Sequence, residues 1–164
     1  MPIDEVTQAA VHALWEAGAR HGRPPAPVPE ADPWDAADVD GSADALDSAR
    51  GRVSVLFDGA PALAVHLHRD GRDTVRVEDV VDLEVPRRDV VAVVDALLAG
   101  RARRRATVRG LWGNLLGVLL SNPAPSDLVV RVGGDDGTAP REYTGPVLLA
   151  VPLSGWLMSL RAPD

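Results

Sequence analysis

The chain contains no lysine and no cysteine, and few aromatic residues, among its 164 residues. Without lysine it lacks the usual Schiff-base amine and the phosphate-binding lysine of a P-loop. Without cysteine it has no thiol nucleophile, disulfide, zinc ribbon or iron–sulfur ligand. All basic side chains other than histidine are arginine, a bias that is typical of a GC-rich bacterium.

What the chain does contain is enough apolar sequence for one core, because 46% of its residues are hydrophobic. The formal net charge of −7 disfavours nucleic acids and anionic membranes, which are polyanions, and is compatible with a basic protein partner. The start, Met1–Glu5, is acidic and does not resemble a signal peptide. The longest uncharged run, 144–160, is broken by two prolines and a glycine. We therefore expect a cytoplasmic protein with no membrane partner.

Three segments differ in composition. Residues 1–22 have apolar residues at helical spacing and predict a helix from Asp4 to Arg20, with Asp4 as its cap. Residues 23–50 contain five prolines and then seven acids without a base, which indicates a linker or surface loop. Residues 51–164 carry the alternating patterns of a core, so we expect one α+β domain in all.

Alternating apolar residues between 52 and 85 predict an antiparallel β-meander with one buried face. Asp70-Gly71 marks the turn between its second and third strands. A two-residue loop there would set apolar residues against polar ones, so we predict an odd-length loop. The cross-strand pairs expected from this loop are Leu67 with Val75, Val65 with Val77, His68 with Thr74 and His66 with Arg76.

Beyond the meander, Pro86 opens a predicted helix that Gly100 ends. The arginine-rich stretch 101–110 could be a strand, and 111–122 is typical of a short buried helix. The remaining predictions are a strand over Leu128–Val132, a loop over 133–140, and one or two strands between Tyr143 and Leu160.

Two charged sets are candidates for binding a partner protein. One is the acidic segment, with Asp35, Asp38, Asp40, Asp44 and Asp47, and the other is the basic cluster Arg101, Arg103, Arg104 and Arg105, with Arg109 behind it. A guanidinium fork binds a carboxylate or a phosphate through two hydrogen bonds. Charge balance within the protein is the alternative, because cations are favoured after a helix C-terminus and the acidic segment could fold over the arginines. Only Trp112 lies nearby for base stacking, so nucleic acid is not an expected partner.

A calcium site in the acidic segment is a weaker interpretation. With Gly41 at the sixth position of an EF-hand loop, several carboxylates fall at ligand positions. However, Ala36 stands at the first ligand position, Asp47 replaces the glutamate at the twelfth, and no amphipathic helix precedes the loop. A solvated acidic segment fits better.

His66 and His68 share one face of a predicted strand and could form two ligands of a metal site. A third ligand is not evident, unless Asp73 or Glu78 is brought close by the hairpin. We therefore take His66, His68 and Arg76 as candidate small-ligand residues, and expect no metal and no cofactor. The serines fall in neither a G-x-S-x-G nor an S-x-x-K pattern, so no catalytic residue is assigned.

These observations favour a non-enzymatic protein-binding module, in a specific form an immunity or antitoxin-type inhibitor of a basic partner. One alternative is a small-ligand-binding protein or enzyme with a pocket between sheet and helices. Another is a subunit of a homo- or hetero-oligomeric assembly, with the apolar tail around Trp156 and Met158 at the interface.

Overall fold

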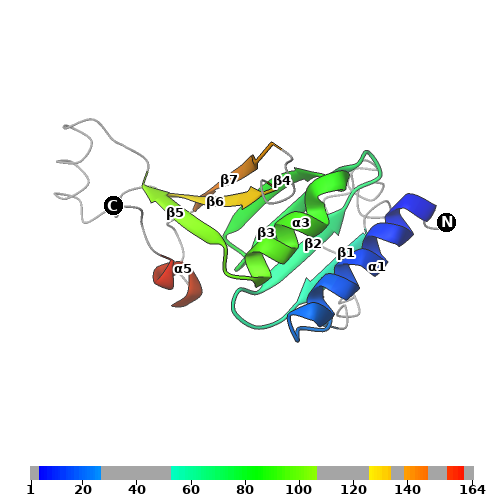
Figure 1. Cartoon of the computed structure of the whole chain (residues 1–164), viewed down its shortest axis with the longest axis horizontal. Helices are drawn as coiled ribbons and strands as arrows, with labels where there is room; N and C mark the ends of the chain where they lie inside the picture. The colour runs from blue at the N-terminus through cyan, green and yellow to red at the C-terminus, as the bar shows by residue number, and fades with distance from the viewer. Residues whose placement is uncertain (1–3, 27–52, 107–125, 134–138, 148–154, 161–164) are drawn as a thin grey trace, which may run out of the picture.

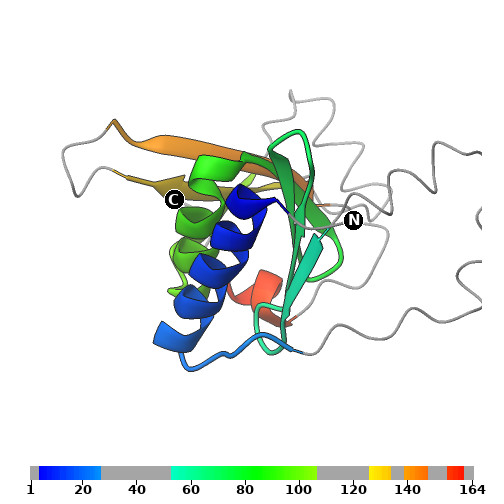
Figure 2. The same cartoon turned by 90° about the vertical axis from the view of Figure 1, so that its right-hand side faces the viewer.

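The computed structural model describes residues 4–26, 53–106, 126–133, 139–147 and 155–160. It is an α+β fold in which two helices lie side by side against one face of a sheet (Figures 1 and 2). In chain order the elements are α1 (Glu5–Arg20), β1 (Val53–Phe57), β2 (Leu63–Leu67), β3 (Arg72–Val77), β4 (Val81–Pro86), α3 (Arg87–Leu98), β5 (Ala102–Ala106), β6 (Ser126–Val132), β7 (Arg141–Val147) and α5 (Gly155–Ser159).

The first helix begins as the sequence predicts. The Asp4 side chain accepts a hydrogen bond from the backbone N–H of Thr7 at 2.8 Å, which satisfies one of the free donors at the helix start. Thr7, Leu14, Ala17 and Gly18 are buried, so this side of α1 faces the rest of the molecule, while Val6 is exposed. Gly18 allows this close approach, because a Cβ atom there would lie 2.5 Å from the Phe57 ring.

Strands β1 to β4 form an antiparallel meander in sequence order, which confirms the predicted α+β class. Alternate residues along each strand are buried, as expected for a sheet with one face on the core. This buried face packs against α1 and α3 in one hydrophobic core, whose largest members include Phe57, Leu67, Leu83 and Leu97.

The loop between β2 and β3 has an odd length, as predicted, but the register differs by two residues from the expected one. Val65 lies opposite Val75, and His66 lies opposite Thr74. The pairs expected from the sequence are therefore wrong: Leu67 with Val75, Val65 with Val77, His68 with Thr74 and His66 with Arg76.

The observed register places Asp73 on the buried face of β3. Its carboxylate accepts hydrogen bonds from the His68 backbone N–H at 2.9 Å and from Arg87. Both registers keep the valines inward, so the apolar pattern could not distinguish between them. The buried Asp73–Arg87 ion pair distinguishes the two registers, and the apolar pattern of the sequence did not reveal it.

Helix α3 begins at Arg87, one residue later than predicted, because Pro86 ends β4 and serves as the N-cap. Its C-terminus has a left-handed glycine, Gly100, at φ +70°. The Gly100 N–H bonds the carbonyl of Leu97, and the Arg101 N–H bonds that of Ala96, which is a Schellman motif. The chain thus turns sharply from α3 into β5.

A second antiparallel sheet has the order β5-β6-β7 and packs its inner face on α3. Strand β7 lies close to β4, so the two sheets adjoin along these strands (Figure 1). Gly145 lies at this junction, where a Cβ atom would be 2.6 Å from the carbonyl oxygen of Asp82. The sequence predicted strands at β5 and β6 and at least one strand in the tail, and all three are confirmed.

Asp89, in the first turn of α3, connects this helix to β7. Its carboxylate accepts hydrogen bonds from Tyr143 Oη at 2.5 Å and from Arg141 at 2.5 and 2.6 Å. Burial acts to raise the pKa of Asp89, but the bonds from Tyr143 and Arg141 outweigh it and the pKa is lowered. The same burial, together with the bond to Asp89, raises the pKa of Tyr143.

The tail forms a short helix, α5, where a second strand was one of the expectations. Leu157 is fully buried in the core, so α5 is attached to the fold by this side chain. The predicted helix over 111–122 and most of the predicted loop over 133–140 lie outside the described residues. Among the described helices, none is long and apolar enough to cross a membrane.

Candidate functional site

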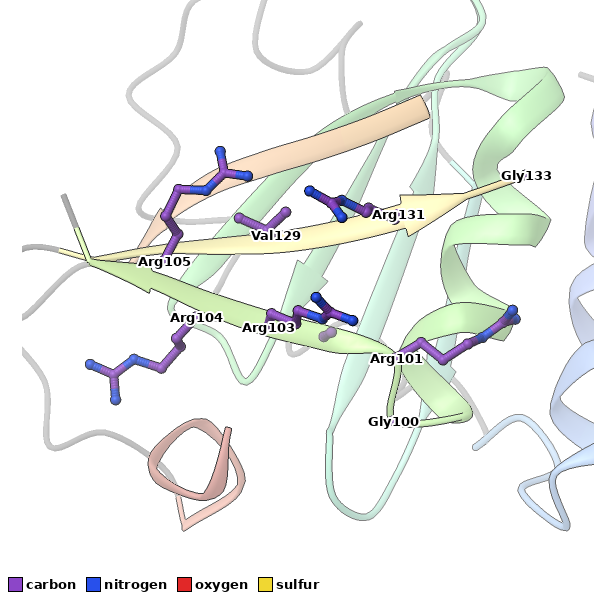
Figure 3. Close-up of a pocket in the computed structure, with 9 residues that line it drawn as sticks. Gly100, Arg101, Arg103, Arg104, Arg105, Val129, Arg131 and Gly133 are labelled. Atoms are coloured by element: carbon purple, nitrogen blue, oxygen red, sulfur yellow. The ribbon is translucent and has the colours of Figure 1, made fainter. Parts of the chain in front are cut away.

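The basic cluster predicted from the sequence lies mainly on β5. Because residues alternate along a strand, Arg103 and Arg105 are on the face of the sheet that points away from α3. Ala102 is buried on the inner face, and Arg104 shares that side. Arg101 lies in the turn before β5, next to Arg103 (Figure 3).

Strand β6 adds a further arginine that was not among the residues predicted from the sequence. Arg103 lies directly opposite Val129, and Arg131 is two residues further along β6 on the same face. Such diagonal neighbours are within reach of long side chains. The alternation of buried and exposed residues around Arg131 could have placed it on an outer face, but the pairing of β5 with β6 was not readable from the sequence.

We call Arg101, Arg103, Arg105, Arg131 and Val129 the arginine face (Figure 3). It borders a hollow of about 600 Å³, which Gly100 and Gly133 line at one end. The four guanidinium groups come from both strands and the preceding turn, and Val129 between them is buried.

Several of these arginines have carboxylate partners within the fold. Glu142, on β7, accepts a hydrogen bond from Arg105 at 2.6 Å and one from Arg131 at 2.9 Å. These bonds, the one from Arg131 first, lower the pKa of Glu142, so it is ionised at neutral pH. One carboxylate is thus shared by two guanidinium groups, both of which are about half exposed.

Arg101 forms an ion pair with Asp95 at 2.8 Å. Asp95 also binds Arg20 and His21 at the end of α1, so this carboxylate is shared by three side chains. Arg103 is exposed and makes no ion pair with any residue that the structure describes. The arginine face can therefore bind a further anion. Arg103 is the best placed of its arginines to do so, because it has no ion pair among the described residues.

Arg104 projects on the other side of β5 (Figure 3). One terminal nitrogen donates to Ser126 Oγ at 3.2 Å. Its Nε is buried and has no hydrogen-bond partner within the described part of the chain. A buried donor without a partner carries a free-energy cost of about 1–3 kcal/mol, so an acceptor placed there would be favoured.

His66, His68 and Arg76, the candidate ligand residues, lie on the face of the meander away from the helices or at its turn. His66 Nδ1 is 2.9 Å from Ser54 Oγ, and Arg76 forms a bidentate ion pair with Asp82. The described residues between the meander and the helices form a core of buried apolar side chains, and the alternative of a pocket there stays a prediction. The structure therefore does not bring these three residues together around a pocket there.

No group of three or more histidine, aspartate or glutamate side chains in the described part of the chain could hold a metal ion. Asp73 and Glu78, considered as third ligands to the histidines, have other roles. Asp73 is buried against Arg87, and Glu78 accepts a hydrogen bond from the Ala62 N–H at 3.0 Å.

The acidic candidates lie outside the described residues: Asp35, Asp38, Asp40, Asp44 and Asp47. The same holds for the EF-hand-like pattern and for Arg109. In the tail, Met158 is 64% exposed, and Trp156 is half-buried against the core. An oligomer interface at these two residues stays a prediction.

The chain matches no protein-family model, no curated protein and no solved structure. The fold and the arginine face are therefore the basis for a functional proposal.

Proposed function

We propose that the chain is a non-enzymatic protein-binding module whose arginine face holds carboxylates of an acidic partner segment. The observation that carries the proposal is Arg103, an exposed guanidinium without an ion-pair partner among the described residues, at the centre of a hollow lined by further arginines. A guanidinium fork donates hydrogen bonds to both oxygens of a carboxylate, which gives such a site geometric specificity.

A protein segment suits this face better than a nucleic acid. The lining residues include no aromatic side chain on which a base could stack. The net charge of −7 repels a polyanion at long range, while a segment with a few carboxylates experiences mainly the local arginines. Open placement on the outside of a sheet also suits a macromolecule more than an enclosed small ligand.

The test is titration calorimetry with a hexaglutamate peptide, and with hexaglutamine as the uncharged control. We expect the acidic peptide alone to bind, and binding to weaken with salt because the contacts are exposed ion pairs. The double variant Arg103→Gln/Arg131→Gln should lower the affinity by about tenfold or more, since each lost charged contact contributes of the order of 1 kcal/mol. Arg72→Gln, an exposed arginine on β3, is the matched control and should leave the affinity unchanged.

Equal affinity of the double variant and Arg72→Gln would contradict the proposal. The alternative of a small-ligand-binding protein is tested in the same titration with citrate and pyrophosphate as competitors. If either small anion binds this face more tightly than the peptide, the small-ligand alternative replaces the protein-binding one.

A second candidate is the immunity or antitoxin-type inhibitor of a basic partner. It is favoured by the seven acids between Glu30 and Asp47, a stretch that contains no base. A nona-arginine peptide is a suitable probe, and neutralising the five aspartates 35, 38, 40, 44 and 47 to asparagine should abolish its salt-dependent binding. Binding that survives this change would exclude the acidic segment as its site.

A further inference from the structure

Strand β5 is an edge of its sheet in the part of the chain that the structure describes. Among the described strands the order is β5-β6-β7, and β5 pairs with β6 alone. In an antiparallel pair, half of the backbone N–H and C=O groups of an edge strand point away from the partner strand. The hollow beside the arginine face also follows β5 from Gly100 to Arg105.

The sequence of β5 favours pairing with an acidic strand over pairing with a second copy of itself. Its three central residues are arginines, Arg103, Arg104 and Arg105. Charged residues on an edge prevent pairing with a second copy of the same strand, because like charges would lie opposite each other. An acidic strand would instead be attracted to the same edge.

A strand added beside β5 would place its side chains alternately on the two faces of the sheet. The residues opposite Arg103 and Arg105 would fall on the arginine face, and the residue opposite Arg104 would fall on the other face. Among the residues that the structure describes, Arg104 Nε is a buried donor without a hydrogen-bond partner, and Arg103 has no ion pair. Three consecutive carboxylates would therefore supply both of the missing acceptors.

We propose that β5 binds an extended acidic segment of a partner protein by strand addition, with three consecutive acids paired to Arg103, Arg104 and Arg105. This inference rests on the proposed function and names the conformation and the sequence pattern of its partner. Backbone hydrogen bonds to β5 provide affinity, and the charges on both faces provide specificity.

The experiment uses the full chain and peptides with the core Ala-Glu-Glu-Glu-Ala. Two further peptides carry N-methyl groups on alternate backbone amides, one on the odd and one on the even positions. In strand addition only one of these two sets points towards β5, so only one methylated peptide should lose binding, by about tenfold or more. Hydrogen exchange of the β5 amides that point away from β6 should slow when the unmodified peptide binds.

Equal binding of both methylated peptides would overturn strand addition. The proposed function would nevertheless stand in that case, provided that replacing glutamate by glutamine still abolished binding. If the acidic peptide itself fails to bind, both proposals are wrong.

The role of Arg104 is tested by a double-mutant cycle between Arg104→Gln and the central Glu→Gln of the peptide. If the two groups are paired, each single change should weaken binding, and the double change should cost no more than one of them. Additive losses would contradict the pairing. The unfolding temperature of Arg104→Gln, measured without peptide, shows whether the variant is folded.

Discussion

Arg87 donates two hydrogen bonds to the carboxylate of Asp73, from Nε at 2.5 Å and from a terminal nitrogen at 2.9 Å. The Asp73 side chain is fully buried, and that of Arg87 nearly so. The same guanidinium also donates to the carbonyl of His68 at 2.5 Å and to Thr7 Oγ1 at 2.8 Å. One side chain at the start of α3 thus connects α1 to the turn between β2 and β3.

Breaking this pair on one side should destabilise the protein strongly. Arg87→Met leaves the buried Asp73 carboxylate without its cation, and we expect the free energy of unfolding to fall by about 3–5 kcal/mol. The double variant Arg87→Met/Asp73→Leu removes both charges and should recover much of the loss. Urea denaturation of the single and double variants measures this, and a double variant no more stable than Arg87→Met would contradict the explanation.

The ionisation of Asp89 should make the free energy of unfolding depend on pH. Its pKa in the folded protein lies below the ordinary value of 3.8, because hydrogen bonds from Tyr143 and Arg141 outweigh the effect of burial. The stabilisation is therefore complete above the unfolded-state pKa and is lost as pH falls through the lower folded-state value.

Tyr143→Phe removes one of these bonds and should lower the free energy of unfolding by about 1–3 kcal/mol at neutral pH. The difference between the two proteins should shrink in acid, and urea denaturation at about pH 7 and about pH 3 checks this. A constant difference would contradict it.

Gly145 should tolerate no side chain. A Cβ atom there would lie 2.6 Å from a backbone oxygen of β4 and 2.8 Å from a Val81 side-chain carbon. Gly145→Ala therefore forces the strands apart, and we expect a loss of about 1–3 kcal/mol. Gly155→Ala is the control, because no atom lies within 4 Å of its Cβ position. Thermal unfolding of the two variants should show a lower midpoint for Gly145→Ala alone.

Helix α5 offers a matched pair of neighbours. Leu157 is fully buried in the core, and Met158 is 64% exposed. We expect Leu157→Ala to lower the free energy of unfolding by about 2–5 kcal/mol, and Met158→Ala to change it by less than about 0.5 kcal/mol. Equal effects of the two changes would show that α5 is not held by Leu157. Light scattering on Met158→Ala and the parent chain also tests the predicted oligomer interface in the tail.

Much of the fold could be read from the sequence, because strands and helices with one buried face leave a period in the apolar residues. This applied to the meander, to both long helices and to β6. The register between β2 and β3 could not be read, because it depends on where a buried Asp73–Arg87 pair fits and not on the apolar set. Helix α5 was missed since five residues are too few to show a helical period.

The candidate site was partly readable in the same way. The arginines of β5 are consecutive in the sequence and so formed a visible cluster. Arg131 is a single arginine in an apolar strand, and only the pairing of β6 with β5 brings it to that cluster. The partners Glu142 and Asp95 also come from other elements, so the ion pairs of the arginine face could not be predicted from the sequence.

The contact at Gly145 has a mechanical consequence. Since a Cβ atom at Gly145 would collide with β4, β7 can approach β4 this closely only with glycine at this position.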